Sequence, residues 1–221
     1  MDTATRNSML VAALIFLPAC AGQQTKLAPG DLPLLSSQPQ IHAVHHLPAR
    51  MFWVESSAYT AAGTLFSPLV VLAQAQESKK LQADLRLSDP APRVKGRLVV
   101  MLQRDVGLKN IRTVSDVPKD DNIELLKETF QTGAVLDVRT VKWGIDNNRA
   151  KYSARVRLVR LADSTVLWEA TCSEFVADKA KPSPTMEALT ANDGELLKTK
   201  LGEVADLCAD QLWSWATMKD R

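Results

Sequence analysis

Three closely spaced segments between residues 134 and 175 alternate apolar and polar side chains, as strands with one buried side do. In KYSARVRLVRL, residues 151–161, Arg155 and Arg157 share one face, and the opposite apolar face consists of Tyr152, Ala154, Val156 and Leu158. In TVLWEATCSEF, residues 165–175, the shared apolar face consists of Val166, Trp168, Ala170 and Cys172. Turn residues at 147–148 and 162–164 separate the segments. We therefore predict an antiparallel three-stranded meander, whose apolar face other elements must cover.

Helical periodicity predicts three helices before the meander, at residues 68–87, 92–106 and 121–132. Gly107 and Gly133 end the second and the third. The apolar run at 65–73, within the first of these regions, has three interpretations: a core helix, a helix lying in the membrane interface, or a face used in self-assembly.

The remaining elements are two extended segments and a long final helix. The extended segments are predicted at 41–59, interrupted by Pro48, and at 109–114. Asn192 or Asp193 is the predicted cap of the final helix, whose apolar stripe consists of Leu197, Leu201, Val204, Cys208, Leu212 and Trp215. The predicted fold class is α/β (α+β): a mixed sheet with an antiparallel three-strand meander, packed by helices, and a long C-terminal helix.

Two of the three cysteines fall on predicted apolar faces of the folded part. Cys172 faces the core from the third meander strand, and Cys208 faces it from the final helix. We predict a disulfide between them, which would join the helix to the sheet. The alternative is a pair of buried free thiols.

The third cysteine ends an apolar stretch at the start of the chain. In MDTATRNSMLVAALIFLPAC, the segment from Met9 to Leu17 carries no charge and is too short to span a bilayer. The residues LPAC resemble the lipobox of bacterial lipoproteins. This resemblance implies cleavage before Cys20 and acylation of its sulfur and amine, and Ala21 at the next position favours the outer membrane. The alternatives are an uncleaved apolar terminus or a signal cut elsewhere.

These features predict three regions. Residues 1–19 form a lipoprotein signal peptide, and residues 20–40, rich in Pro, Gly, Gln and Ser, form a flexible tether. Residues 41–221 form a single α/β periplasmic domain. The 27 basic and 25 acidic residues leave a net charge of +2, which offers no general attraction for nucleic acid.

The sequence contains no recognisable catalytic motif. All three histidines lie in IHAVHH, where a strand would place His42 and His46 on one face and His45 on the other, so no metal triad forms. We expect solvated histidines near the tether, no metal, no cofactor and no catalytic residue. The outward face with Arg155 and Arg157 is a candidate surface for an anionic partner, and its alternative is a simply solvated face.

The element order, together with RVRLVRL at 155–161 and VLWEATC at 166–172, resembles bacterial envelope lipoproteins with a small α/β domain. Their examples are the curli-secretion lipoprotein and the amino-terminal domain of the Tol-system propeller protein. The resemblance extends over residues 95–218. It implies a non-enzymatic role in envelope assembly or export, in contact with envelope proteins or with further copies of the same chain.

We therefore expect a lipoprotein anchored in the outer membrane that acts as an accessory or scaffold through protein contacts. One alternative is a periplasmic carrier that binds a small apolar or anionic ligand between the sheet and the early helix. An envelope hydrolase is the last alternative.

Overall fold

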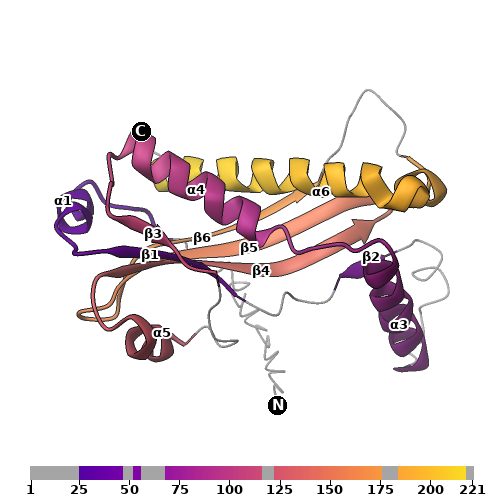
Figure 1. Ribbon diagram of the computed structural model, residues 1–221, viewed down its shortest axis with the longest axis horizontal. Helices are drawn as coiled ribbons and strands as arrows, with labels where there is room; N and C mark the ends of the chain where they lie inside the picture. The colour runs from indigo at the N-terminus through magenta and orange to yellow at the C-terminus, as the bar shows by residue number, and fades with distance from the viewer. Residues whose placement is uncertain (1–24, 47–51, 56–67, 116–121, 176–183, 218–221) are drawn as a thin grey trace, which may run out of the picture.

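The computed structural model describes residues 25–46, 52–55, 68–115, 122–175 and 184–217, which form one six-stranded mixed sheet with helices on both faces (Figure 1). This arrangement confirms the predicted fold class. The strands are β1 (Ile41–His45), β2 (Trp53–Glu55), β3 (Ile111–Thr113), β4 (Ala134–Asp146), β5 (Arg149–Arg160) and β6 (Thr165–Phe175). The helices are α1 (Asp31–Ser36), α3 (Pro68–Asp84), α4 (Ala91–Asp105), α5 (Ile123–Phe130) and α6 (Met186–Thr217).

The predicted antiparallel meander consists of β4, β5 and β6 in sequence order. A two-residue loop joins β4 to β5, and its residues Asn147 and Asn148 have φ angles of 48° and 60°. Asparagine tolerates this left-handed conformation, which matches the twist of a hairpin. The hairpin therefore forms where the two asparagines interrupt the alternating pattern.

A β-bulge in β6 changes the face of one predicted core residue. Leu158 pairs with Trp168, but the next residue, Val159, pairs with Val166, so Leu167 is the extra residue. A bulge inserts one residue into one strand and shifts the alternation beyond it. Val166 therefore lies on the opposite face from Trp168, and its predicted place beside Trp168 is wrong.

The other edge of β4 is occupied by two short parallel strands in succession. β1 pairs with residues 134–138 of β4, and β2 pairs with residues 144–146. The two strands thus form one interrupted extended line, as predicted for 41–59, while Pro48 lies outside the described residues. Beyond β1, β3 completes the sheet in a further parallel pairing.

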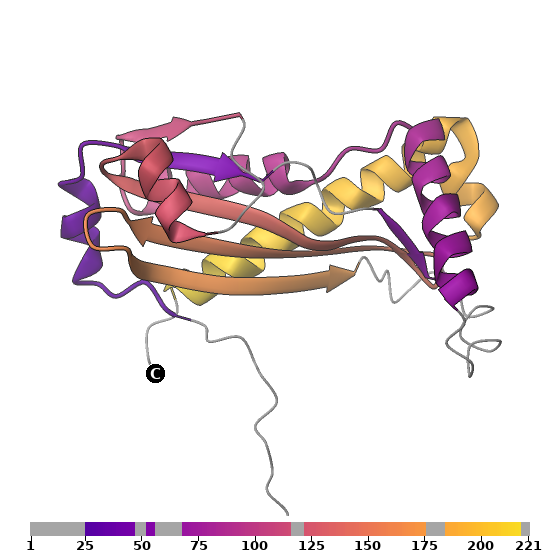
Figure 2. The same cartoon turned by 90° about the horizontal axis from the view of Figure 1, so that it is seen from below.

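Helices α4 and α6 cover the apolar face of the meander and run side by side in the same direction (Figures 1 and 2). Two bidentate ion pairs join them: Arg93 with Asp206 at 2.8 and 2.7 Å, and Arg97 with Asp210 at 2.8 Å for both contacts. From the first ion pair to the second, the position increases by four residues in both helices, so the two helices run parallel and in a fixed register. The main hydrophobic core lies between this helix pair and the sheet.

The final helix is longer than predicted and contains a break. It begins at Met186, and residues 191–194 have non-helical backbone angles. Asn192 and Asp193, the predicted caps, lie in this break with φ angles of 51° and 54°. The continuous helix that packs on the sheet therefore follows the break, close to the predicted start.

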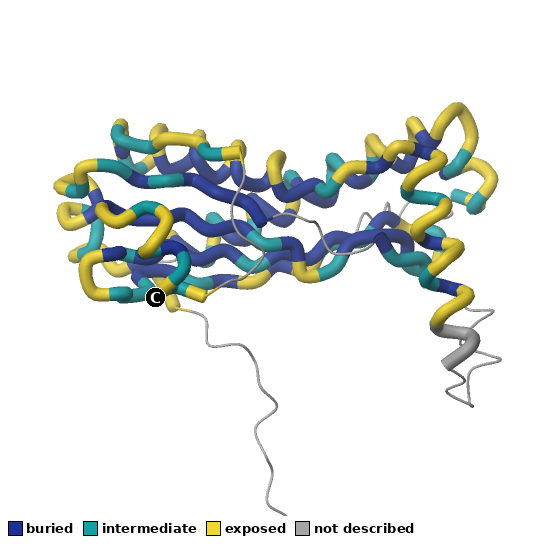
Figure 3. Tube along the Cα trace, turned by 60° about the horizontal axis from the view of Figure 1, so that its bottom comes forward, coloured by how far each residue is buried: buried dark blue, intermediate teal, exposed yellow. Residues whose placement is uncertain are grey.

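The opposite face of the sheet has a smaller apolar cluster under α5. Val44, Leu126, Val135 and Leu161 are buried there together. The Asn122 side chain caps α5 by accepting a hydrogen bond from the Glu124 N–H at 3.0 Å. Figure 3 shows this face, with the central strands buried along most of their length.

Helix α3 packs against β2 through polar side chains. The Ser78 hydroxyl accepts a hydrogen bond from the Val54 N–H at 3.2 Å, and the Gln74 amide donates to the Val54 carbonyl. Leu72 is 59% exposed. Ala73 is exposed too, while Leu81 further along the helix packs against the main core. The side chains of the apolar run before Leu72 lie outside the described residues, so its three interpretations stay open.

The prediction of a flexible tether is wrong from Thr25 onward. Thr25 forms an antiparallel bridge with Glu169 of β6, and α1 follows at Asp31–Ser36. Leu27 and Leu35 join the main core. Burial of these leucines outweighs the breaking tendency of the surrounding Pro, Gly and Ser residues. The folded part thus begins at Thr25 and not at Ile41, which is 16 residues earlier than predicted, and residues 20–24 lie outside the described residues.

Gly144 is the residue that allows β2 to approach β4. Its φ angle is +153°, and a Cβ atom there would collide with the Trp53 carbonyl oxygen. We predict that Gly144→Ala lowers the free energy of unfolding by about 1–3 kcal/mol, because the backbone strain and the displacement of β2 add together. Urea denaturation measures this change.

Gly96→Ala is the matched control. Gly96 lies in α4 with no atom near its missing Cβ. Alanine favours helix over glycine, so this substitution should raise the free energy of unfolding by roughly 0.5–1 kcal/mol. Equal effects from the two substitutions would contradict the close approach of β2 and β4.

Candidate functional site

The structure joins Cys172 and Cys208 in a disulfide between β6 and α6, as predicted. Their Cα atoms are 5.4 Å apart, and both side chains are buried. The bond ties the final helix to the meander face that it covers. Cys20 lies outside the described residues, so its lipidation stays a prediction.

The candidate anionic-partner face is not open at both arginines. Arg155 and Arg157 do share a face, but the Arg157 side chain is only 7% exposed. Its Nε and Nη2 atoms donate to Oδ2 of Asp137 at 3.1 and 2.7 Å. Arg155 is half-buried, with its Nε 3.8 Å from Oε1 of Glu169. The predicted solvated face is therefore wrong at Arg157, because the facing strand supplies a buried carboxylate.

A buried polar cluster forms around this carboxylate. Asp137 is 1% exposed, and its other oxygen, Oδ1, contacts Nε2 of His46. Burial acts to raise the pKa of Asp137, but the hydrogen bond and charge of His46 and the charge of Arg157 outweigh it and lower the pKa. The cluster binds three neighbouring strands together, because His46 follows β1 while the other two residues lie on β4 and β5.

The prediction of solvated histidines is wrong for two of the three. His45 and His46 are both buried, on opposite faces of the sheet as their spacing predicts. Nζ of Lys95 lies 3.0 Å from Nδ1 of His45 and donates to the Val114 carbonyl at 2.8 Å. His42 stacks on Phe130 with ring centroids 4.5 Å apart. His45 and His46 are buried because the chain from β1 onward lies inside the sheet, between β3 and β4.

A second polar chain connects the start of α4 with the centre of the meander. The Thr140 hydroxyl donates to Oδ1 of Asp89 at 2.5 Å and lies 3.1 Å from the Tyr152 hydroxyl. Burial raises the pKa of both Asp89 and Tyr152. In the part of the chain that the structure describes, no group of three His, Cys, Asp or Glu side chains converges in a way that could hold a metal ion.

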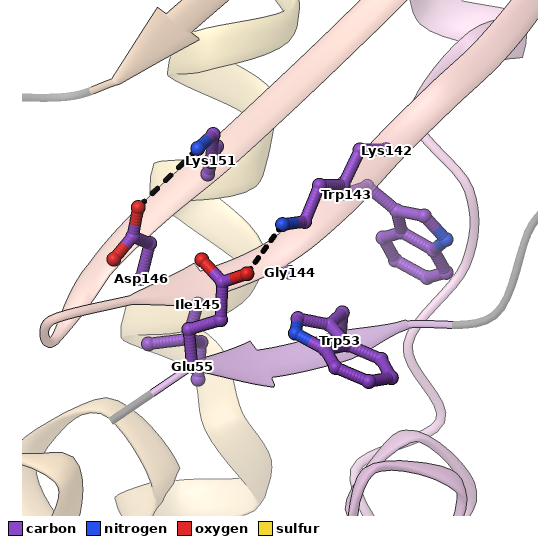
Figure 4. A pocket seen from close by; sticks show the side chains of 8 residues that line it. All are labelled: Trp53, Glu55, Lys142, Trp143, Gly144, Ile145, Asp146 and Lys151. Atoms are coloured by element: carbon purple, nitrogen blue, oxygen red, sulfur yellow. Dashed lines mark hydrogen bonds and ion pairs between the residues drawn. The ribbon is translucent and has the colours of Figure 1, made fainter. Parts of the chain in front are cut away.

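The hollow between β2 and the end of β4 is filled by its own side chains (Figure 4). Nζ of Lys142 contacts Oε1 of Glu55 at 2.5 Å, and Nζ of Lys151 lies 3.3 Å from Oδ2 of Asp146. Trp53 also lines the hollow. The hollow has no room for a water molecule, so this place is a packed junction of strands rather than a ligand site.

An open groove of about 640 Å³ lies at the end of the molecule where α4 and α6 both terminate. One wall is the segment that leads into α1, and the other walls are the last turns of the two long helices. Figure 1 shows α1 and the ends of α4 and α6 at the same end of the molecule. Its volume falls within the ~300–1,000 Å³ typical of small-molecule sites. The lining residues are Lys26, Leu27, Ala28, Pro29, Leu32, Asp105, Val106, Trp213, Ala216 and Thr217.

The groove was not predictable from the sequence because its walls come from three distant parts of the chain. The segment from Lys26 to Leu32 was predicted to be tether. The signal that could have found it is the leucines at 27, 32 and 35, which recur within an otherwise polar stretch. The groove is not the site expected for a carrier, between the sheet and the early helix.

The groove lies a short length of chain away from Cys20. Four residues lie between Cys20 and Thr25, where the chain joins β6, so these two residues are at most about 18 Å apart along a fully extended chain. Leu27, in the groove wall, is at most about 25 Å of chain from Cys20. Whatever holds Cys20 therefore also holds this end of the domain close to it.

No family model and no curated protein matches this chain. Among solved structures, a PelC dodecamer from Paraburkholderia phytofirmans is 14% identical over 55% of this chain and 71% of its own, with a TM-score of 0.33. A point variant of that PelC is also 14% identical, over 57% of this chain and 75% of its own, with a TM-score of 0.35.

A third match is a Xanthomonas campestris protein described as DUF330. It is 12% identical over 86% of this chain and 90% of its own, with a TM-score of 0.32. TM-scores this low do not establish a shared fold. The expected kinship with envelope lipoproteins therefore stays a prediction.

The buried cluster predicts an acid-sensitive fold. Asp137→Asn removes the buried carboxylate that Arg157 and His46 contact, and should lower the free energy of unfolding by about 3–5 kcal/mol at neutral pH. The folded pKa of Asp137 lies below the unfolded value of about 3.9. Its ionised form therefore contributes stability above that pH and loses the contribution as the pH falls through the folded pKa.

Urea denaturation between neutral and acidic pH tests both effects. Glu169→Gln is the control, since this carboxylate faces Arg155 on the same sheet face but is partly exposed, and its loss should cost about 0–1 kcal/mol. If Asp137→Asn costs no more than Glu169→Gln, the cluster does not stabilise the sheet.

Proposed function

We propose that this protein is a lipid-anchored accessory or scaffold of the bacterial envelope, attached to the periplasmic face of the outer membrane through Cys20 and acting without catalysis. The observation that carries the proposal is the pairing of Cys172 with Cys208. Disulfides persist in oxidising compartments such as the periplasm. With these two cysteines paired, the remaining one is Cys20, directly after the short apolar segment.

The anchoring chemistry agrees with the described helices. Within the ranges that the structure describes, no helix is both long and apolar enough to cross a membrane. Acyl chains on Cys20 would supply the attachment, since each buried methylene adds roughly 0.8 kcal/mol of membrane affinity and more than one chain makes a stable anchor. Ala21 at the next position supports the outer membrane over the inner.

A carrier is the second candidate function. The open apolar groove between the α1 segment and the ends of α4 and α6 favours it. A scaffold would assemble into a ring or dimer in detergent, whereas a carrier would co-purify with a ligand. Turnover of a substrate that one side-chain change abolishes would contradict both.

Intact-mass analysis of protein extracted from its native membrane tests the anchor. We predict a terminus at Cys20 with an added lipid mass, which Cys20→Ser removes. Cys172 and Cys208 should react with an alkylating reagent only after reduction.

The double variant Cys172→Ser, Cys208→Ser is the matched control. It should keep the lipid mass but lose about 2–5 kcal/mol of unfolding free energy, because the disulfide constrains the unfolded chain. An unprocessed mass with three thiols that alkylate without reduction would overturn the proposed function.

A further inference from the structure

We propose that the open groove lined by Leu27, Leu32, Val106, Trp213 and Ala216 binds one acyl chain of a membrane phospholipid. The proposal rests on the proposed function, because it takes Cys20 to be anchored in the membrane. It adds a ligand and a site to a protein otherwise proposed to act through protein contacts.

The groove has the surface that an acyl chain requires. Seven of its ten lining residues are apolar, and they come from both sides, with Leu32 on the α1 segment and Trp213 near the end of α6. Both side chains are only partly buried and pack against the main core. Filling the groove would remove this apolar surface from water, which yields about 25 cal/mol for each Å² covered.

The position of the groove identifies the membrane as the source of the ligand. At most about 25 Å of chain separates Leu27 from Cys20. An acylated cysteine lies at the surface of the hydrocarbon region, beneath a polar layer of only about 5–8 Å. The groove is therefore held within reach of the lipid headgroups, and a ligand from the membrane meets it before one from the bulk periplasm does.

Charged side chains also line the groove. Lys26 and Asp105 belong to its lining, and Arg104 pairs with Asp105 at 2.5 and 2.9 Å. The hydrogen bond from Arg104 lowers the pKa of Asp105, which keeps this side chain ionised. The ends of α4 and α6 add the partial negative charge of helix C-termini.

The polar headgroup of a membrane phospholipid can therefore lie beside charged side chains while its acyl chain contacts the apolar lining.

Photocrosslinking tests the proposal on the full-length lipidated protein. The protein is reconstituted into vesicles of phosphatidylethanolamine and phosphatidylglycerol, with a trace of phosphatidylethanolamine that carries a diazirine in one acyl chain. We expect lipid adducts on peptides that contain Leu32 or Trp213. Leu32→Asp should reduce these adducts roughly tenfold or more, because it places a charge against the acyl chain.

Leu34→Asp is the matched control. Leu34 belongs to the same short helix and carries the same side chain, but it is 42% exposed and does not line the groove. This variant should give adducts at the level of the unchanged protein. Leu32→Gln, which is neutral and similar in size, should show an intermediate loss, and thermal unfolding followed by circular dichroism checks that each variant is folded.

Three outcomes would overturn the proposal. Adducts that fall equally in the Leu32 and Leu34 variants, or that lie outside the groove peptides, would show that lipid does not bind there. Adducts that increase when residues 218–221 are deleted would identify those residues as the occupant. Crosslinks between two copies of the chain at Leu32, in place of lipid adducts, would identify a second copy.

The same samples separate this proposal from the proposed function. A lipid mass on Cys20 without groove adducts would leave the anchored scaffold standing and remove the acyl-chain site. An intact mass without lipid on Cys20 would overturn the proposed function itself, and with it the source of the ligand.

Discussion

Strand β4 hydrogen-bonds to three other strands, and the arrangement of the molecule depends on this pairing. Its carboxylate Asp137 accepts hydrogen bonds from the strand on either side, through Arg157 of β5 and His46 after β1. A shift of one residue in either pairing would move these partners to the opposite face and leave a buried charge alone. We infer that the cluster favours a single register in both the parallel and the antiparallel half of the sheet.

The fold was predictable where the information is local. Alternation defined β5, the asparagine pair placed its hairpin, and helical spacing predicted α4 and α6. The bulge at Leu167 was not predictable, because an extra residue leaves the polar and apolar pattern nearly unchanged while it turns Val166 to the other face. The disulfide was predictable because each cysteine lies on the apolar face of its own element, and both faces turn toward the same core.

The polar interior and the groove were not predictable for a different reason. The sequence alone indicates a surface position for Arg157, because it does not show that Asp137 faces this side chain. His46 is 91 residues from that carboxylate in the chain. The groove combines residues near positions 30, 105 and 215, which only the assembled fold brings together. The wall from Lys26 to Leu32 was also difficult to predict from composition, because Pro, Gly and Ser usually indicate a linker.

The bridge between Thr25 and Glu169 fixes where the chain leaves the folded domain. With Cys20 in a membrane, a domain secured at this edge remains in a thin layer above the lipid and cannot turn freely. The domain then meets its partners by diffusion along the membrane. Molecules confined to the same layer encounter it at an increased effective concentration and in a restricted set of orientations. Lengthening the four residues between Cys20 and Thr25 would relax that restriction without changing any surface of the domain.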